Sequence, residues 1–263
     1  MIRGLYTSTT GMLANEIRMD DVANNLANVN TTGYKGDVEA MKSFPQMLVH
    51  RINDTYLKVS GIEGEMDLRP LIGMSTFGVV VDEIATDHAQ GEIYVTGRNF
   101  DLAIDGRGFF TLQTPFGERL TRDGEFSMNA SHELVNSLGY RVMGETGPVV
   151  LKGKKFVVDE KGAVFNGEKG DEFVDRLKIV TVDDLRTVRK RGHNMFEVGP
   201  EHPQPRPADD FALRQGAVEK SNVNAISMLR DMVQIMRTYE ANQRVILTED
   251  QELGRAVNDI ARL

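Results

Sequence analysis

The sequence predicts an α+β protein in which long N- and C-terminal helices of the coiled-coil type pair with each other and a β-rich domain lies between them. Three observations support this fold class. Apolar residues recur at heptad spacing near both ends of the chain. Short apolar runs in the middle are separated by Gly, Asn-Gly and Asp-Gly turn signals. A proline-rich segment, residues 199–210, joins this region to the C-terminal helix.

The N-terminal helix is predicted within residues 1–34. One row of positions seven residues apart is apolar throughout, and a second row is polar at Ser8 and Asn15 before it becomes apolar. Gly33 is the residue expected at the helix end, because glycine adopts the left-handed conformation without strain. The predicted seam consists of Leu5, Met12, Met19, Val22, Leu26 and Val29.

The middle of the chain divides into two predicted parts. Residues 35–76 are expected to form an extended linker with room for one short helix at 43–54, because no period is sustained there. Residues 77–211 are expected to form the β-rich outer domain. The run DGRGFF, residues 105–110, predicts a tight turn, since a dinucleotide-binding loop would need a third glycine and a following helix.

The C-terminal helix is predicted within residues 212–263, with Ser221 as its N-cap. Two amphipathic helices packed on a conventional core are the alternative interpretation. We favour pairing, because helices with narrow seams and little attached core are marginal alone and need each other or neighbouring copies. The predicted C-terminal seam includes Leu229, Met232, Met236, Tyr239, Ile246 and Leu253.

Composition excludes several classes of function. The 263 residues carry a formal net charge of −8, with a pI near 5.3, which argues against a nucleic-acid-binding protein. The absence of cysteine excludes disulfides, thiol catalysis and cysteine-ligated metal. No stretch approaches the roughly 20 apolar residues that span a bilayer, and the N-terminal residues lack the pattern of a cleaved secretory signal. Membrane insertion is therefore not expected.

No constellation of residues predicts catalysis, and we expect no cofactor and no metal. None of the five His residues lies within five positions of another, so zinc-type spacing is absent. Nucleophile-elbow and Ser-x-x-Lys motifs are also absent. A basic run at 186–191 could bind nucleic acid or anionic lipid. We favour an exposed loop or a charged contact between subunits, because the run is isolated in an acidic chain.

Three ordered blocks of the sequence resemble the flagellar basal-body rod and hook family of axial proteins. They are RGLYTSTTGMLA to DDVANNLANVNTTGYK near the N-terminus, DLAIDGRGFF with LTRDGEFSM in the middle, and QGAVEKSNVNAISMLRDMVQIMRTYEANQRVILTEDQEL near the C-terminus. Within the family, the chain looks most like the proximal-rod-type protein and next like the distal-rod protein. The hook protein is a further alternative, although it usually carries a larger outer β insertion.

The resemblance implies a structural subunit, not an enzyme. Members of the family are exported unfolded by the flagellar type III apparatus and polymerise through their terminal helices into the periplasm-spanning rod of the basal body. The implied partners are copies of the chain, other rod and hook subunits and the export apparatus. A soluble β-domain adaptor, dimerised by a terminal coiled coil, is the rival interpretation.

The resemblance also gives the Asn-rich motif ANNLANVNTTGYK, residues 23–35, a role in docking between subunits. The Asn side chains of this motif lie on a different face of the helix from the apolar seam. From that face they could form hydrogen bonds with a neighbouring copy or with the backbone at the helix end. The polar residues added in this way to the predicted assembly seam are Asn24, Asn25 and Asn28.

Overall fold

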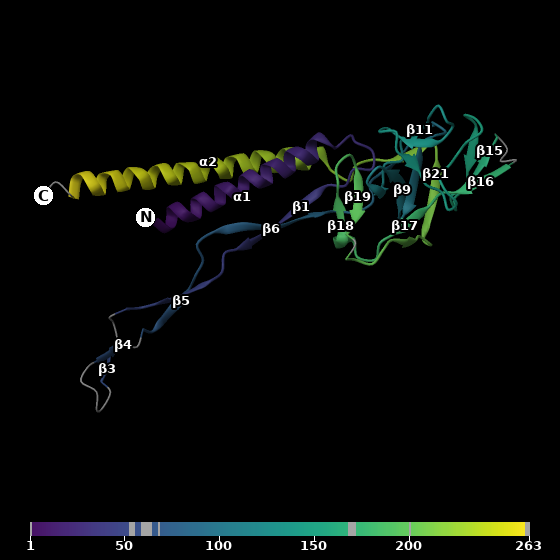
Figure 1. Cartoon of the computed structure of the whole chain (residues 1–263). Coiled ribbons are helices and arrows are strands. Elements are labelled where there is room, and N and C mark those ends of the chain that lie inside the picture. Colours follow the sequence, from purple (N-terminus) through teal and green to yellow (C-terminus); the bar gives the residue numbers. More distant parts are fainter. Residues whose placement is uncertain are drawn as a thin grey trace. The chain divides into compact units, whose positions relative to one another are not determined.

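The structure is a computed structural model that describes residues 2–52, 56–58, 65–67, 69–167, 172–199 and 201–260 (Figure 1). It has an N-terminal helix, α1 (Ile2–Ala27), a β-rich middle and a C-terminal helix, α2 (Ala225–Arg255). A short π-helical segment, Ala256–Ile260, follows α2. The predicted α+β class and the order of its parts are therefore confirmed. Parts of the predicted linker (53–55, 59–64, 68), of the outer domain (168–171, 200) and of the C-terminal segment (261–263) lie outside the described residues.

The chain forms two compact units, each built from segments that are distant in sequence. The first, here called the helical unit, consists of Met1–Val22, Glu39–Ile84 and Arg230–Leu263. The second, the β unit, consists of Ala23–Val38 and Ala85–Leu229. The end of α1 and the beginning of α2 thus belong to the β unit.

An antiparallel ribbon follows α1 where the linker was predicted. Strand pairs form in the order β1 with β6, β2 with β5 and β3 with β4. The short helix considered for 43–54 is not the structure found, since Met47–His50 is strand β2, with Leu48 opposite Met74 of β5. The ribbon strands are β1 (Asp37–Ser43), β2 (Met47–His50), β3 (Tyr56–Lys58), β4 (Glu65–Asp67), β5 (Leu71–Ser75) and β6 (Val79–Thr86).

The main sheet of the β unit has nine strands within the described residues. Its order is β11-β12-β13-β9-β10-β19-β18, and β17 pairs with both β9 and β20. The strands are β9 (Phe109–Thr114), β10 (Gly117–Thr121), β11 (Phe126–Met128), β12 (Leu134–Asn136), β13 (Arg141–Val142), β17 (Ile179–Thr181), β18 (Val188–Lys190), β19 (Met195–Val198) and β20 (Arg206–Pro207). A 3-10 turn, Leu185–Thr187, precedes β18. The proline-rich segment thus contributes a short strand, β20, as it returns towards α2.

Smaller sheets complete the β unit. They pair β14-β15-β16, β8 with β21, and β7 with β22. Their strands are β7 (Ile93–Val95), β8 (Leu102–Gly106), β14 (Phe156–Val158), β15 (Ala163–Asn166), β16 (Glu172–Arg176), β21 (Phe211–Gln215) and β22 (Ala217–Glu219). The predicted turn at DGRGFF links β8 to β9. Gly108 has φ +147°, and a Cβ there would lie 2.8 Å from Ile179 Cγ2.

The hydrophobic core lies in the β unit, where the alternating runs place one face of each strand inside. Phe110 and Phe126 meet edge to face at 5.1 Å between ring centroids, and aliphatic side chains from several strands surround them. Burial of this apolar surface is the main favourable term in folding. The core provides a rigid support for the two segments that connect it to the helices.

The N-cap of α2 is Asn224 instead of Ser221. The Asn224 Oδ1 accepts hydrogen bonds from the backbone N–H groups of Ile226 (3.0 Å) and Ser227 (3.2 Å). Ser221 Oγ accepts from Val223 N at 3.2 Å and so stabilises the turn before the helix. Ser and Asn are both good caps, and α2 begins at Ala225, directly after Asn224.

Candidate functional site

The Asn-rich motif marks the end of α1, which terminates at Ala27. The Asn28 Nδ2 donates to the Asn24 Oδ1 and to the Asn24 backbone carbonyl, each at 2.9 Å. Asn24 is exposed and Asn28 is half-buried. These two amides therefore satisfy the helix end and also leave polar surface accessible.

Asn25 has different surroundings, because its side chain is 4% exposed. Its Nδ2 donates to the Asp37 carbonyl at 2.8 Å, and its Oδ1 accepts from Asp37 N at 2.9 Å and from the Tyr34 hydroxyl at 3.1 Å. The amide thus binds the chain that leaves α1 back onto the helix end. Of the two expected kinds of partner, a neighbouring subunit or the backbone at the helix end, the structure shows backbone contacts for Asn25 within its own chain.

Gly33 allows two backbone segments to approach closely. Its φ is +65°, and a Cβ would lie 2.4 Å from the Arg122 carbonyl carbon. Its N–H donates to the Glu219 backbone carbonyl at 2.7 Å. Because α1 ends at Ala27, Gly33 lies beyond the helix end that it was expected to form.

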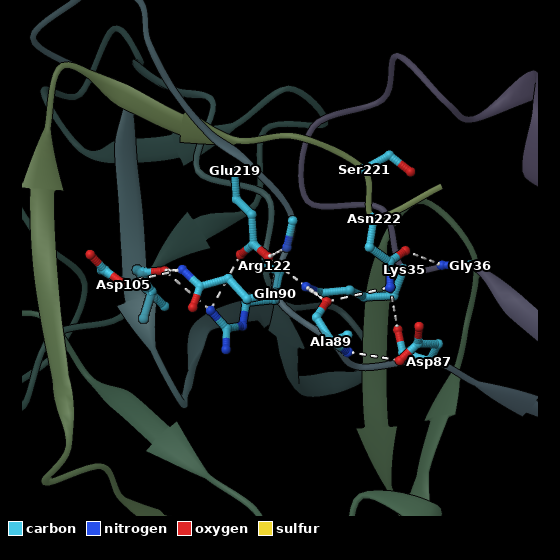
Figure 2. Close-up of polar contacts among 12 residues, drawn as sticks. Lys35, Gly36, Asp87, Ala89, Gln90, Asp105, Arg122, Glu219, Ser221 and Asn222 are labelled. Atoms are coloured by element: carbon cyan, nitrogen blue, oxygen red, sulfur yellow. Dashed lines mark hydrogen bonds and ion pairs between the residues drawn. The ribbon is translucent and has the colours of Figure 1, made fainter. Parts of the chain in front are cut away.

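Lys35 is enclosed in the β unit with 1% of its side chain exposed. Its ammonium donates to the Glu219 Oε1 at 2.5 Å and to the Ala89 carbonyl at 2.8 Å (Figure 2). A lysine is almost never fully buried unless it is paired. Lys35 follows α1 and Glu219 precedes α2, so this ion pair joins the two ends of the β unit.

Arg122 completes a buried triad with Lys35 and Glu219. Its Nη1 lies 3.3 Å from the Glu219 Oε2 (Figure 2). Its guanidinium also donates to the carbonyls of Ile104 (3.3 Å) and Gly106 (2.8 Å). Each carboxylate oxygen of Glu219 therefore faces a different cation. Burial lowers the pKa of Lys35 and of Arg122, and the Glu219 carboxylate opposes that shift in both.

Asn222 adds a neutral contact beside the triad. Its Oδ1 accepts from Gly36 N at 2.8 Å, and its Nδ2 donates to the carbonyls of Asp87 (2.9 Å) and Ala89 (3.3 Å). We call Lys35, Arg122, Glu219 and Asn222 the polar junction. It connects the segment after α1, the loop before β7 and the segment before α2, all within the β unit.

The predicted basic run also contacts the chain near the polar junction. Lys190 donates to the Asp37 carboxylate at 2.7 Å and to the Lys35 carbonyl at 2.5 Å. Arg191 pairs with Glu197 at 2.6 Å. Two basic residues of the run are therefore neutralised by acidic groups of the same unit.

The predicted N-terminal seam is partly enclosed. Val22 is buried, and Leu5, Met12, Met19, Leu26 and Val29 are half-buried. The fully buried positions of α1 also include residues outside the predicted seam, namely Ser8, Ala14 and Asn15. Ser8 and Asn15, the polar positions of the second heptad row, are therefore buried in the structure.

The predicted C-terminal seam is more exposed. Met232, Ile246 and Leu253 are half-buried, whereas Leu229, Met236 and Tyr239 are exposed. Among the α2 side chains that the structure describes, Ile235 alone is fully buried, at 2% exposed. Ile235 was missed, although its spacing of three from Met232 and four from Tyr239 is the heptad signal that could have found it.

Within the helical unit, α1 closely approaches side chains of α2 at two glycines. A Cβ at Gly4 would lie 2.3 Å from the Glu249 Oε1, and one at Gly11 would lie 2.9 Å from the Asn242 Nδ2. Larger apolar residues of both helices point to solvent instead. They are Tyr6 (60% exposed), Leu13 (56%) and Ile17 on α1, with Val233, Met236 and Leu247 on α2.

The described part of the chain offers no group of three or more His, Asp or Glu side chains that could hold a metal ion. None of the helices in that part is long and apolar enough to cross a membrane. The distinctive polar feature is therefore the polar junction, and the distinctive apolar feature is the exposed surface of the two helices.

Three family models match separate parts of the chain. Residues 5–35 match the flagella basal body rod protein family, residues 103–166 the flagellar hook protein FlgE/F/G D1 domain, and residues 214–259 the flagellar basal body rod FlgEFG protein C-terminal region. The matches are in the same order as the N-terminal helix, the β unit and the C-terminal helix.

Similar proteins cover the whole chain. The flagellar hook-basal body complex protein FlhO of Bacillus subtilis is 29% identical over all of both chains. The flagellar basal-body rod protein FlgF of Caulobacter vibrioides is 31% identical, over 97% of this chain and 96% of its own. FlgG of Borreliella burgdorferi, also a flagellar basal-body rod protein, is 31% identical over 98% of each chain.

The fold and these comparisons define a structural class, in which a β-rich body lies between two terminal helices. The chain belongs to the flagellar basal-body rod protein family. Proteins of this family are located in the flagellar basal body. The family is one of structural proteins and not a known family of enzymes.

Proposed function

We propose that the protein is a rod subunit that is exported by the flagellar type III apparatus and polymerises through its terminal helices into the axial drive shaft. The observation that carries this proposal is the apolar surface that the two helices leave exposed. Gly11 lies against Asn242 of the other helix, and large apolar side chains such as Leu13 face solvent, although Val22 and Ile235 are buried. A helix pair designed for an isolated protein would place its apolar stripe inside.

The exposed apolar residues of α1 form one stripe. Tyr6, Leu13 and Ile17 follow one another at spacings of seven and four, which places them on the same face of the helix. Full burial of each such side chain contributes roughly 1.5–3 kcal/mol. In a helical polymer, the same contact is repeated by every subunit and does not close. A stripe of this kind can therefore supply a substantial part of the assembly energy.

The predicted seam residues keep an assigned role in this proposal. The half-buried and exposed members can complete their burial against neighbouring copies of the chain. Val22 and Asn25 are already enclosed, so their contribution is to shape the helix end. The residues proposed to contact neighbouring subunits are Leu5, Met12, Met19, Asn24, Leu26, Asn28, Val29, Leu229, Met232, Met236, Tyr239, Ile246 and Leu253.

The proposed partners are other rod and hook subunits, in addition to copies of the same chain. The full-length similarity to a protein described as part of the hook-basal body complex supports this. We propose the proximal-rod type for the subunit, with the distal-rod type as its alternative. Cross-linking in isolated basal bodies tests the assignment, since a proximal subunit is expected to cross-link to other proximal-rod components.

Substitution of the α1 stripe tests the proposed function. Leu13→Asp is expected to leave the purified protein folded, because the side chain is exposed. It should lower incorporation into basal bodies by about tenfold or more, since burying an unpaired carboxylate costs more than 1.4 kcal/mol. The measurement is the amount of protein in basal bodies isolated from a strain that makes only the variant, together with swimming motility.

Leu138→Asp is the matched control, because Leu138 is 44% exposed in a turn of the β unit. It should preserve incorporation and motility. Normal motility of the Leu13→Asp strain would contradict the role of the α1 stripe. A closed dimer of constant mass at all concentrations in sedimentation would favour the adaptor alternative, and intact rotating flagella in cells without the protein would exclude a required rod subunit.

A further inference from the structure

The polar junction joins the three matched segments of the chain at one buried point. Lys35 lies in the match at 5–35, Arg122 in the match at 103–166 and Glu219 in the match at 214–259. Each segment thus supplies one charged group to the triad (Figure 2). The contacts between Lys35 and Glu219 span 184 residues of sequence, so no local pattern produces them.

We propose that Lys35, Arg122 and Glu219 form a positioning lock, which fixes the end of α1 and the beginning of α2 on the β unit in the single arrangement that can assemble. This inference rests on the proposed function, because it gives the triad a role in assembly. The three residues are positioning residues, since they are buried and act through the helix ends.

The backbone contacts around the triad show how the lock holds both helix ends. Gly33 N donates to the Glu219 carbonyl at 2.7 Å, and Gly36 N donates to the Asn222 Oδ1 at 2.8 Å. Asn25 then binds the end of α1 to Asp37. A shift in the chain after α1 would therefore break contacts to β22, to the segment before α2 and to α1 itself.

The buried charges disfavour any other register of the segment that follows α1. The two carboxylate oxygens of Glu219 are divided between Lys35 and Arg122, and Gly91 N also donates to the Oε1 at 2.9 Å. The residues beside Lys35 are Tyr34 and Gly36, and neither can supply a cation if the register slips by one. Any slipped register would leave buried charges unpaired, which is strongly unfavourable.

Stability alone does not explain a buried triad. Replacing buried ion pairs by apolar residues of similar volume is often neutral or stabilising, whereas removing one partner is destabilising. Apolar side chains would hold the three segments together over a range of registers. The charged groups add selectivity for one register, which a subunit that must repeat identical contacts along a polymer requires.

The first experiment compares a single variant with a compensated one. Lys35→Met leaves Arg122 and Glu219 in place, and we expect at least about tenfold faster amide exchange at 33–38 and 217–222, together with loss of motility. The triple variant Lys35→Met, Arg122→Met, Glu219→Leu should recover the unfolding midpoint but not incorporation into basal bodies. Wild-type incorporation of the triple variant would overturn the proposal.

Lys152→Met is the matched control, because Lys152 pairs with Glu172 at an exposed site of the same unit. This variant should change neither the amide exchange at 33–38 and 217–222 nor the incorporation into basal bodies. Lys35→Met with wild-type exchange rates at both segments would also overturn the proposal.

The second experiment uses the unaltered protein and does not depend on a variant that folds. The amides of Gly33, Gly36 and Gly91 donate to three different groups of the polar junction. A lock predicts that they become exchangeable together, with equal opening free energies and equal denaturant dependence. Independent opening of the three amides would overturn it. Absence of the wild-type protein from basal bodies would instead refute the proposed function, and the exchange result would still stand.

Discussion

At the scale of single residues, His88 is enclosed without a polar partner. Its ring centroid lies 5.9 Å from that of Phe109 and 5.5 Å from that of Phe196. Neither ring nitrogen has a hydrogen-bond partner within the described residues. Burial, followed by the positive charges of Lys35 and Arg122, lowers the pKa of His88 from 6.5 to about 4. The imidazole is therefore neutral at pH 7, as its apolar surroundings require.

The lowered pKa predicts a pH dependence of stability. Between pH 6.5 and about 4 the unfolded chain binds a proton at His88 that the folded chain does not bind. The free energy of unfolding therefore falls as the pH falls through this window. We expect a loss of about 2 kcal/mol after allowing for partial solvent screening. Urea titrations at pH 7 and pH 4 measure it.

A variant isolates this contribution. His88→Phe should remove the part of the pH dependence that belongs to His88, while His132→Asn should retain it. His132 is exposed at the turn between β11 and β12 and has φ +63°, which asparagine tolerates. The groups that face His88 with charge are Lys35, Arg122, Asp87 and Lys190. An unchanged dependence in His88→Phe would contradict the assignment of this effect to His88.

At the scale of elements, the helices and the ribbon differ in how far sequence determines them. The heptad rows predicted both helices because a helix is stabilised by contacts at short sequence separation. The ribbon was not predicted, because β2 is paired with β5 across more than twenty residues and its apolar residues fit either secondary structure.

The candidate site was predictable only in part. The seam residues follow from periodicity, and Ile235 shares that signal. The polar junction does not, because Lys35 and Glu219 are each ordinary charged residues in sequence and become distinctive only when the fold encloses them. Asn25 was noticed in the sequence as an amide within a helix, but its partners Tyr34 and Asp37 depend on how the chain turns after α1.

The turn after α1 gives a prediction that compares two glycines. Gly33→Ala should destabilise the β unit by more than about 2 kcal/mol, because φ is +65° and the Arg122 backbone occupies the space of the new Cβ. Gly117→Ala also places alanine at positive φ, 103°, but meets no atom within 4 Å. It should cost about 1 kcal/mol. Thermal unfolding of the two variants measures the difference, and equal losses would contradict the close-approach argument.

At the scale of the whole molecule, the two units differ in what stabilises them. The β unit has an extensive buried core of aromatic and aliphatic side chains. The helical unit instead presents apolar side chains to solvent on both helices and on the ribbon. A two-stranded ribbon and a pair of helices with little core are each marginal in isolation. In the free subunit, the helical unit should therefore unfold more easily than the β unit.

This contrast predicts the exchange behaviour of the isolated and the assembled protein. In the monomer, amides of the β-unit core should be protected, and those of 5–22 and 230–253 should exchange much faster. In the proposed polymer, both helices should gain protection, because neighbouring copies are proposed to cover their exposed apolar residues. Hydrogen exchange with mass spectrometry of the two forms makes the comparison. Strong protection of both helices in the monomer would contradict it.

The separation of 184 residues between Lys35 and Glu219 has a consequence for the timing of folding. The entropy cost of closing so long a loop must be met before the stabilising contacts form. The Lys35–Glu219 contact is therefore expected to form late in folding. If the chain emerges from a narrow conduit with its N-terminus first, Lys35 must wait until β22 has followed. In the proposed assembly, α1 would then reach the growing end of the rod before Glu219 of the same chain could bind Lys35. The helix would therefore remain free to bind subunits that are already in place.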